Sequence, residues 1–353
     1  MSVPKRFSII SIRAISLMAK RERVGVVGFT GYSGAELVQI LRRHPRVEPV
    51  LLEHRSHGDD EQPFHLSGVA RLPWSRKSLR EGGLELVLLA TPHEVSLELA
   101  PMALDAGLKV VDLSGAFRLR TVDNFRRWYK MEHTRPDLLA EAAYGLPEYF
   151  RNVTKVARLV SNPGCYPTAA NLALRPLVTE GILDREAGIV CDAKSGVSGA
   201  GKKATDKTHF SSVTENFSAY AVLQHRHVPE VLLTSGIEEY EFSFTAQLIP
   251  VHRGILETIY VRTARSVSRK QLEDLYRKIY GKEAFVRIYP DGKLPSLQSV
   301  AHTNFCDLGF QVDSKTRRVV IVAAIDNLVK GAAGQAVQNM NLMLKFPETT
   351  ALL

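Results

Sequence analysis

The stretch Arg23-Val24-Gly25-Val26-Val27-Gly28-Phe29-Thr30-Gly31-Tyr32-Ser33-Gly34 decides the fold that the sequence predicts. Its apolar start is typical of a buried strand, and residues 35–41 have the amphipathic pattern of a helix. At such a strand–turn–helix junction the pyrophosphate of a dinucleotide lies on the helix N-terminus. The glycine spacing is GxxGxxG, and a tight turn without a ligand is the alternative. We expect the following turn residues at the cofactor: Gly28, Thr30, Gly31, Tyr32, Ser33 and Gly34.

The end of the next strand bears on the choice of dinucleotide. Residues 47–52 are strand-like and are followed by Glu53, Arg55 and Ser56. An acid at this place binds the ribose 2′-hydroxyl of NAD, whereas Arg and Ser pair with a 2′-phosphate. Arg55 and Ser56 therefore favour NADP(H) as the cofactor, and Glu53 leaves NAD as the alternative.

Repeated strand and helix patterns continue through the first half of the chain. Strand-like runs at 84–90 and 109–112 flank a helical pattern at 96–106, which predicts a parallel, doubly wound sheet. Ligands bind at the carboxyl ends of such strands. Polar side chains follow these ends and are expected to cluster: His93, Asp112, Ser114 and Arg118. The guanidinium group of Arg118 can bind a phosphate or a carboxylate through two hydrogen bonds. The alternative is that Arg118 stabilises a loop.

A cysteine lies on a stiff turn in Ser161-Asn162-Pro163-Gly164-Cys165-Tyr166-Pro167-Thr168. The apolar run 156–160 predicts a strand before it, and residues 169–174 predict a helix after it. Unpaired N–H groups and the positive end of a helix dipole lower the pKa of a thiol at such a place. We expect Cys165 to be a nucleophile, the alternative being a cysteine buried as a small apolar residue.

The second half of the chain has a different pattern. Strand-like runs at 188–193, 241–248, 256–262, 284–288 and 319–325 are separated by few helices. This predicts an α+β domain with a mostly antiparallel sheet. The segment 194–203 is glycine-rich and cationic, which predicts a flexible loop. Residues 330–345 predict a helix whose small residues at the start permit a close approach of backbone.

Composition excludes several classes of protein. The 353 residues are 45% hydrophobic and 24% charged, as in ordinary globular proteins, and no apolar run approaches the ~20 residues of a membrane span. Of the net charge of +9, +5 falls in the first 23 residues, and no basic–aromatic alternation suggests nucleic-acid binding. Three cysteines without a CxxC pair indicate a reduced, cytoplasmic protein. Cys191 and Cys306 lie in strand-like runs and are expected to pack in the core.

Residues 1–22 are basic and rich in Ser and Ile. A transit-type leader and a start at Met18 are both open, and we expect a disordered extension outside the fold.

Family segments recur in order along residues 23–346: TPHEVS, DLSGAFRL, YGLPE, SNPGCYPT, DAKSGVSGAG, HRHVPE, PVHRGI and DNLVKGAAGQAVQNMNLM. On these segments the chain resembles the N-acetyl-gamma-glutamyl-phosphate reductase family, within the aspartate-semialdehyde dehydrogenase and glyceraldehyde-3-phosphate dehydrogenase-like group. It departs from the expected pattern at Gly115-Ala116, where Ala-Asp is expected, and at Glu94, where glycine is usual.

The resemblance implies a Rossmann-like NADP-binding domain at 23–163, an α+β catalytic and dimerisation domain at 164–329, and a C-terminal helix at 330–353 that packs back on the first domain. It implies NADPH-dependent reduction of an acyl phosphate to an aldehyde and phosphate through a cysteine thioester, as a step of arginine biosynthesis. It also implies a homo-oligomer (dimer or tetramer). Reductases of aspartyl phosphate or of a carrier-bound aminoadipyl phosphate, and a non-catalytic sensor, are the alternatives. The implied site residues are Cys165, His225 and His227 for catalysis, Arg118, Ser195 and Arg253 for substrate, and Asn327 for cofactor.

The segment HRHVPE supplies the expected acid–base group. If residues 225–227 are extended, His225 and His227 face the same way, because side chains alternate along a strand. We favour His227 as the general base. A metal pair is the alternative, but no third ligand is patterned nearby, so no metal is expected.

Overall fold

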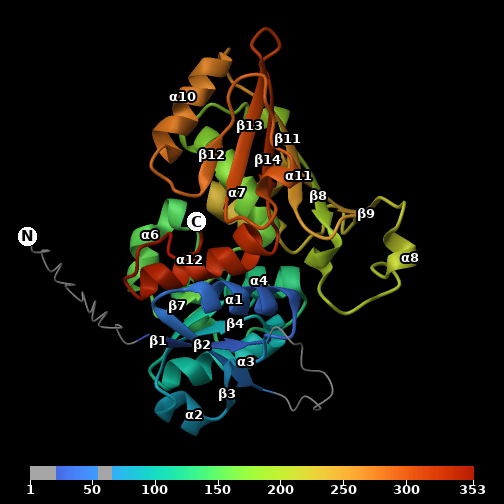
Figure 1. The fold of residues 1–353 in the computed structure, drawn as a ribbon. Helices are drawn as coiled ribbons and strands as arrows, with labels where there is room; N and C mark the ends of the chain where they lie inside the picture. The colour runs from blue at the N-terminus through green and yellow to red at the C-terminus, as the bar shows by residue number, and fades with distance from the viewer. Residues whose placement is uncertain (1–20, 55–65) are drawn as a thin grey trace, which may run out of the picture.

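The computed structural model describes residues 21–54 and 66–353, and its two seven-stranded sheets lie one above the other in Figure 1. The predicted cofactor residues Arg55 and Ser56 and the extension before residue 21 lie outside the described residues. Helix α12 lies between the two sheets (Figure 1).

The first sheet is parallel throughout, in the order β3-β2-β1-β4-β5-β7-β6. Its strands are β1 (Glu22–Val27), β2 (Val47–Glu53), β3 (Ala70–Pro73), β4 (Leu84–Leu89), β5 (Lys109–Asp112), β6 (Ala143–Tyr144) and β7 (Leu159–Ser161). The chain leaves β1 toward β2 on one side and returns to β4 on the other, so a ligand crevice opens at the carboxyl ends of β1 and β4. The predicted Rossmann-like domain is confirmed.

The glycine turn after β1 is tight because two glycines touch. Gly28 has φ +77°, and a Cβ at Gly34 would overlap the carbonyl of Gly28. At Gly31 a Cβ would meet nothing closer than the Gly28 carbonyl at 3.5 Å. Gly28 and Gly34 therefore shape the turn, whereas Gly31 is not required by packing.

The second sheet has the order β12-β13-β14-β11-β8-β10-β9. Its strands are β8 (Ile189–Gly196), β9 (Ser218–Tyr220), β10 (Phe242–Ile249), β11 (Ile255–Arg262), β12 (Val286–Ile288), β13 (Cys306–Asp313) and β14 (Arg318–Ile325). Four of its six pairings are antiparallel, while β8–β10 and β12–β13 are parallel. The predicted, mostly antiparallel sheet is confirmed.

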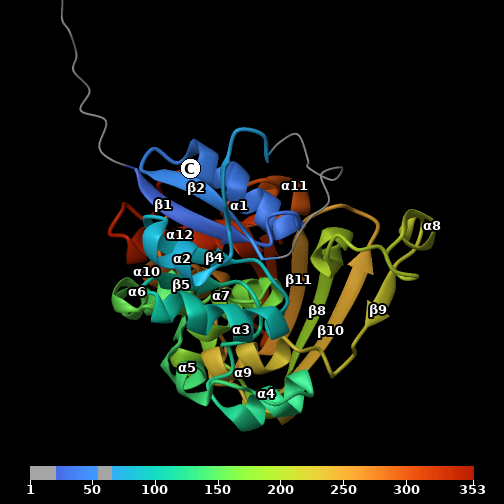
Figure 2. The same ribbon diagram turned by 90° about the horizontal axis from the view of Figure 1, so that it is seen from below.

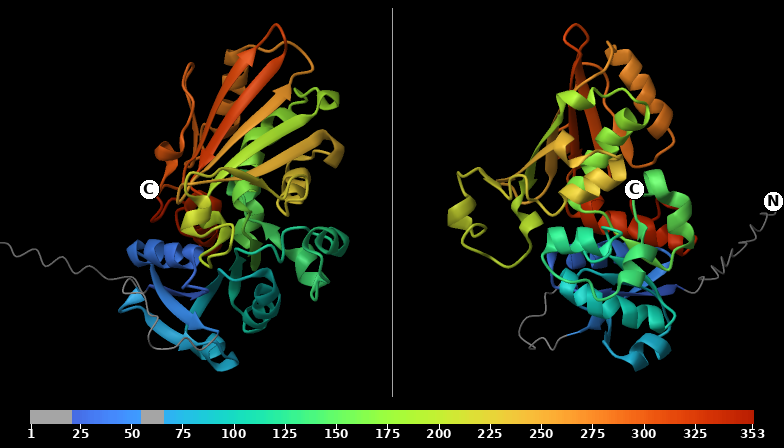
Figure 3. Two further views of the ribbon diagram at one scale, coloured as in Figure 1. Left: turned by 90° about the vertical axis from the view of Figure 1, so that its right-hand side faces the viewer. Right: turned by 180° about the vertical axis from the view of Figure 1, so that it is seen from behind.

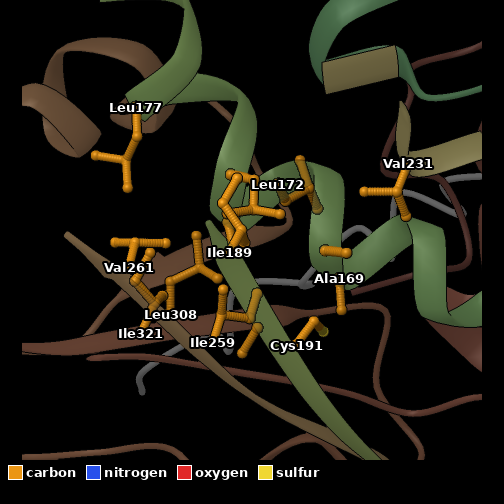
Figure 4. Packing of buried hydrophobic residues seen from close by; sticks show 14 of the residues in the cluster. Ala169, Leu172, Leu177, Ile189, Cys191, Val231, Ile259, Val261, Leu308 and Ile321 are labelled. Atoms are coloured by element: carbon orange, nitrogen blue, oxygen red, sulfur yellow. The ribbon is translucent and has the colours of Figure 1, made fainter. Parts of the chain in front are cut away.

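Helix α7 (Cys165–Thr179) fills the inner face of this sheet. Figure 4 shows its residues Ala169, Leu172 and Leu177 packed against Ile189 and Cys191 of β8 and against strands β11, β13 and β14. The helix begins at Cys165 itself, earlier than predicted, because Pro167 in the first turn needs no N–H partner. Cys191 and Cys306 are fully buried.

Most of the remaining helices flank the sheets, whereas α12 lies between them and α8 stands out beyond β9 (Figures 1, 2 and 3). They are α1 (Tyr32–Arg43), α2 (Arg76–Glu81), α3 (His93–Asp105), α4 (Val122–Tyr129), α5 (Pro136–Glu141), α6 (Pro147–Val156), α8 (Phe210–Val213), α9 (Val228–Ser235), α10 (Arg269–Tyr280), α11 (Leu297–Val300) and α12 (Gly334–Met343). The strand predicted over 156–160 is wrong at its start, because Val156 ends α6 and the strand begins at Leu159.

Two predicted segments differ from the expectation in their local structure. The cationic segment 194–203 continues β8 to Gly196 and then forms the short 3-10 helix η4 (Val197–Ala200) rather than a wholly flexible loop. The C-terminal helix starts as a π-helix, η6 (Val329–Ala333), which contacts α7 and β14, before α12 runs along α1, α6 and β5. A π-helical turn is frequent at functional sites.

Candidate active site

Cys165 lies at the N-terminus of α7, between two cavities. The smaller has a volume of about 300 Å³ and the larger about 1030 Å³. Both are lined by Cys165, Gly199, Arg226 and His227. A group at this junction is therefore reachable by two ligands that occupy different cavities.

The resting thiol is neutral, contrary to the prediction. Burial raises the pKa of Cys165 to about 11, against the smaller, opposite effects of the Tyr166 backbone N–H and of Arg118. The side chain is half-buried. The helix N-terminus lies where predicted. The free-energy cost of desolvating a thiolate at this place is larger than the stabilisation that the helix dipole provides. The sulfur therefore needs a base to become nucleophilic.

His227 lines both cavities together with Cys165. Its ring packs on Gly164, where a Cβ would lie 2.8 Å from Nε2. Burial, followed by the charges of His225, Arg118 and Arg226, holds the pKa of His227 well below its usual value. Its Nδ1 is closed to solvent and has no hydrogen-bond partner among the described residues. A neutral imidazole thus packs on the residue that precedes the neutral thiol, and both side chains line the same two cavities.

His225 is adjacent but lies deeper in the domain. Burial and Arg226 lower the pKa of His225 to about 4, and this histidine lines only the larger cavity. The two rings are 4.8 Å apart, and Nδ1 of His225 accepts a hydrogen bond from the backbone N–H of His227 at 3.1 Å. The predicted extended segment is wrong: His227 has helical backbone angles at the start of α9, so a turn brings the rings together.

The smaller cavity reaches the predicted nucleotide turn. Gly31, Tyr32, Ser33 and Gly34 line it, whereas Gly28 and Thr30 do not. Helix α1 begins at this turn without a side-chain cap, which leaves the N–H groups of its first turn for an anion. These features fit the pyrophosphate of a dinucleotide. Glu53, at the end of β2, is paired with Arg71 at 3.0 Å.

The small residues of η6 allow the C-terminal segment to touch the cysteine. A Cβ at Gly331 would lie 2.8 Å from Cβ of Cys165. Asn327, just before η6, accepts from the N–H of Gly254 at 2.6 Å and donates to Ser198 at 2.9 Å. Gly331 and Asn327 both line the smaller cavity, so this segment forms part of its wall.

Arg118 lines the smaller cavity but is largely engaged within the protein. It donates to the carbonyls of Asn162 at 2.8 Å and Leu113 at 2.7 Å, and pairs with Glu230 at 3.0 Å. Glu230 also accepts from the N–H of Gly164 at 2.9 Å. These contacts connect the turn before Cys165 to α9, which agrees with the alternative that Arg118 stabilises a loop.

The other two predicted substrate residues lie apart. Ser195 lines the larger cavity and donates to the carbonyl of Gly196 at 3.0 Å. Arg253 lines neither cavity and is held by Asp326 at 3.1 Å and by Glu36 at 3.0 Å. The structure brings Ser195 to the junction but engages Arg253 in a link between the second sheet and α1.

Three residues at the site were missed by sequence reasoning: Tyr129, Arg226 and Glu230. Arg226 lies between the two predicted histidines, and Glu230 is the last residue of the same HRHVPE motif. The motif could therefore have indicated both residues. Tyr129 lies at the end of α4, where no local pattern marks it. In the described part of the chain, no group of three or more His, Cys, Asp or Glu side chains is arranged to hold a metal ion, and no helix is long and apolar enough to span a membrane.

Comparison with known proteins agrees with this architecture. Residues 23–157 match the family described as semialdehyde dehydrogenase, NAD binding domain, and residues 165–327 match semialdehyde dehydrogenase, dimerisation domain. Aspartate semialdehyde dehydrogenase II of Vibrio cholerae, complexed with ASA, has a similar fold with a TM-score of 0.68 at 19% identity, covering 93% of this chain and 99% of that chain. The aspartate semialdehyde dehydrogenase of Candida albicans, solved with NADP, has a TM-score of 0.64 at 16% identity, with 92% and 99% covered. Fold and site thus define an oxidoreductase of the semialdehyde dehydrogenase type.

Curated relatives show to which family of this class the chain belongs. N-acetyl-gamma-glutamyl-phosphate reductase of Symbiobacterium thermophilum is 47% identical over 343 residues, 94% of this chain and 97% of the relative. The enzyme of the same name from Pelotomaculum thermopropionicum is 46% identical over 338 residues, again 94% and 97%. The chain belongs to the N-acetyl-gamma-glutamyl-phosphate reductase family.

Proposed function

We propose that this protein reduces N-acetyl-gamma-glutamyl phosphate to N-acetyl-glutamate 5-semialdehyde and phosphate with NADPH, in arginine biosynthesis. The observation that carries the proposal is that Cys165 and His227 both line the junction of the two cavities. An acyl group bound to this sulfur is accessible from both sides. The names of the curated relatives support the substrate.

His227 takes the thiol proton as the sulfur attacks the acyl carbonyl carbon. Because both groups are neutral at rest, the transfer creates the nucleophile only at the moment of attack. The carbon–oxygen bond to phosphate breaks, phosphate leaves with the bonding electrons, and a thioester remains on Cys165. The positive end of α7 and its first N–H groups stabilise the negative charge that develops on the carbonyl oxygen.

The same pair completes the turnover. Bound NADPH, on the α1 side of the junction, would supply the hydride that reduces the thioester carbon. The carbon–sulfur bond then breaks, the aldehyde leaves, and His227 returns its proton to the sulfur. Glu230 and Arg118 hold the Cys165 turn in place through Gly164 and Asn162 during both half-reactions.

One assay tests this function. Protein, N-acetyl-glutamate semialdehyde, phosphate and NADP are mixed and NADPH is followed, with aspartate semialdehyde in a parallel arm. We expect NADPH from the first aldehyde. Faster turnover of aspartate semialdehyde would assign the sibling reaction, and no NADPH from either aldehyde would favour a carrier-bound substrate or a sensor. Incubation with the acyl phosphate alone should add the acyl mass to Cys165.

The preference for NADP(H) is part of the proposal. Pairing with Arg71 partly neutralises Glu53, the residue that would favour NAD. Arg71 lies 5.8 Å from the ring centroid of Phe29, on the β3 side of the nucleotide turn. Comparison of kcat/KM for NADP and NAD tests the preference, and a higher value for NAD would reverse it.

We further propose that the protein works as a homodimer or homotetramer in the cytoplasm. The matched dimerisation domain supports an oligomer, and Val190 of β8 and Tyr260 of β11 are exposed apolar side chains on paired positions of the second sheet. The reduced Cys165 that the chemistry needs suits a reducing compartment. Light scattering measures the oligomer, and a monomer at working concentration would contradict it.

A further inference from the structure

One corner of the smaller cavity contains the hydroxyl group of Tyr129. The ring of Tyr129 stacks on Phe125 at 4.9 Å and meets the edge of His93 at 5.0 Å, so two contacts fix its position. Its hydroxyl is closed to solvent and has no hydrogen-bond partner among the described residues. Buried hydroxyl groups are nearly always bonded, which points to a group that the protein itself does not supply.

Gly115 makes room for this hydroxyl. A Cβ at Gly115 would overlap the hydroxyl and the ring carbons of Tyr129. Gly115 does not have a left-handed φ, so an alanine fits its backbone conformation and only the tyrosine stands in its way. The position of the Tyr129 hydroxyl therefore depends on the missing side chain at residue 115.

The second polar group of this corner is the guanidinium of Arg226. It is exposed, lines both cavities, and has no hydrogen bond or ion pair with another described residue. It lines the smaller cavity together with Tyr129 and His93. Arg118 also lies nearby, but Glu230 offsets its charge and three protein acceptors occupy its N–H groups.

The corner therefore offers donors and positive charge. Burial raises the pKa of Tyr129 to about 12, so its hydroxyl keeps the proton and can donate. No Asp or Glu is among the described residues that line the smaller cavity. Of the carboxylates close by, Asp112 accepts from Ser114 and Glu230 is paired with Arg118, while the exposed Glu94 lies 3.1 Å from Nε2 of His93. Such a corner attracts an anion.

We infer that Arg226 and the Tyr129 hydroxyl bind the phosphate of the acyl phosphate, and inorganic phosphate in the reverse reaction; the inference rests on the proposed function. The phosphate is bonded to the carbon that Cys165 attacks, whereas the carboxylate of the substrate is several bonds farther away. Arg226 lines the junction together with Cys165 and His227, which is where the phosphate must leave. Arg118 acts as a positioning residue.

The reverse reaction tests this inference because phosphate and aldehyde are then separate substrates with separate KM values. In Arg226→Gln and in Tyr129→Phe we expect the KM for phosphate to rise about 10- to 100-fold, the effect of one lost bond to a charged group. The KM for the semialdehyde should stay within about twofold, because the carboxylate binds elsewhere. Arg226→Lys should restore part of the loss.

Gly115→Ala tests the location of the hydroxyl without removing it. The added methyl group must push Tyr129 aside, so the KM for phosphate should rise as it does in Tyr129→Phe. Combining the two changes should add little, because both remove the same bond. Independent, additive effects would contradict the assignment of Tyr129.

Two controls make a negative result informative. Arg127→Gln removes a nearby positive charge that pairs with Glu239 on the surface and should leave both KM values unchanged. A circular dichroism spectrum and a melting temperature like those of the wild type show that each variant is folded. A wild-type protein without turnover would refute the proposed function. An active wild type whose variants raise the KM for the semialdehyde, or raise neither KM, would refute the phosphate site alone.

Discussion

Arg118 and Glu230 form an ion pair of 3.0 Å whose side chains are 6% and 0% exposed. The pair joins the loop after β5 to α9, and Glu230 extends it by accepting from the N–H of Gly164. The turn that holds Cys165 is thereby fixed to the segment that holds His227. Arg118, which the sequence predicts to bind substrate, thus also joins these two segments.

Glu230→Gln should destabilise the protein by about 3 kcal/mol, because Arg118 then remains as a buried charge without its counter-ion. Urea unfolding measures the change. The matched control is Glu239→Gln, which breaks an exposed pair with Arg127 and should cost no more than about 1 kcal/mol. Equal effects of the two changes would show that the buried pair is not structurally important.

Cys165→Ser should abolish turnover while NADPH binding persists. A serine hydroxyl beside the neutral His227 is a much weaker nucleophile than a thiol, and its ester is a poorer hydride acceptor than a thioester. Steady-state rates and cofactor fluorescence check the two parts. A rate near that of the wild type would rule out the covalent route.

His227→Asn should lower kcat about 10²- to 10⁴-fold, the usual contribution of a general base. His225→Asn should have a smaller effect, because His225 lines only the larger cavity and is separated from the smaller one by His227. Parallel kinetics of the two variants decide between them. A larger loss in His225→Asn would reverse the assignment.

Gly331→Ala should impair both stability and rate, since its Cβ would lie 2.8 Å from Cβ of Cys165 and must displace α7 or η6. Overpacking of this kind costs roughly 1–3 kcal/mol. Gly31→Ala is the comparison, because its Cβ has room, and its free energy of unfolding should change by less than about 0.5 kcal/mol. Similar destabilisation in both variants would contradict the close contact at Gly331.

Stability should fall as the pH drops below the unfolded-state histidine pKa of about 6.5. Burial lowers the folded-state pKa of His44, His133 and His225, the last to about 4. Between those values the unfolded chain binds more protons than the folded one, so acid favours unfolding, by roughly 3 kcal/mol for His225 by about pH 4. Urea unfolding at about pH 7 and about pH 5 should show less acid sensitivity in His225→Asn than in the wild type. An identical pH dependence would contradict the lowered pKa of His225.

Local patterns in the amino-acid sequence were enough to predict much of the fold. The run 23–34 specified strand, turn and helix because its apolar period, its glycines and its helix start are local properties. The beginnings of α7 and of the C-terminal helix differ from the prediction. Pro167 is a local signal for a helix start at Cys165 that was not used. The π-helical turn at which Gly331 meets Cys165 involves two segments that are distant in the chain, so no local pattern predicts it.

The sequence by itself determined which residues are available for chemistry: a cysteine on a stiff turn, two histidines in one motif, and a glycine turn before a helix. Only the tertiary structure decided their states and partners. Burial makes the thiol of Cys165 and the imidazole of His227 neutral, Glu230 engages Arg118, and Arg226 and Tyr129 line one cavity from different domains. Desolvation and pairing depend on neighbours that are distant in the chain, so they are decided only when the chain has folded.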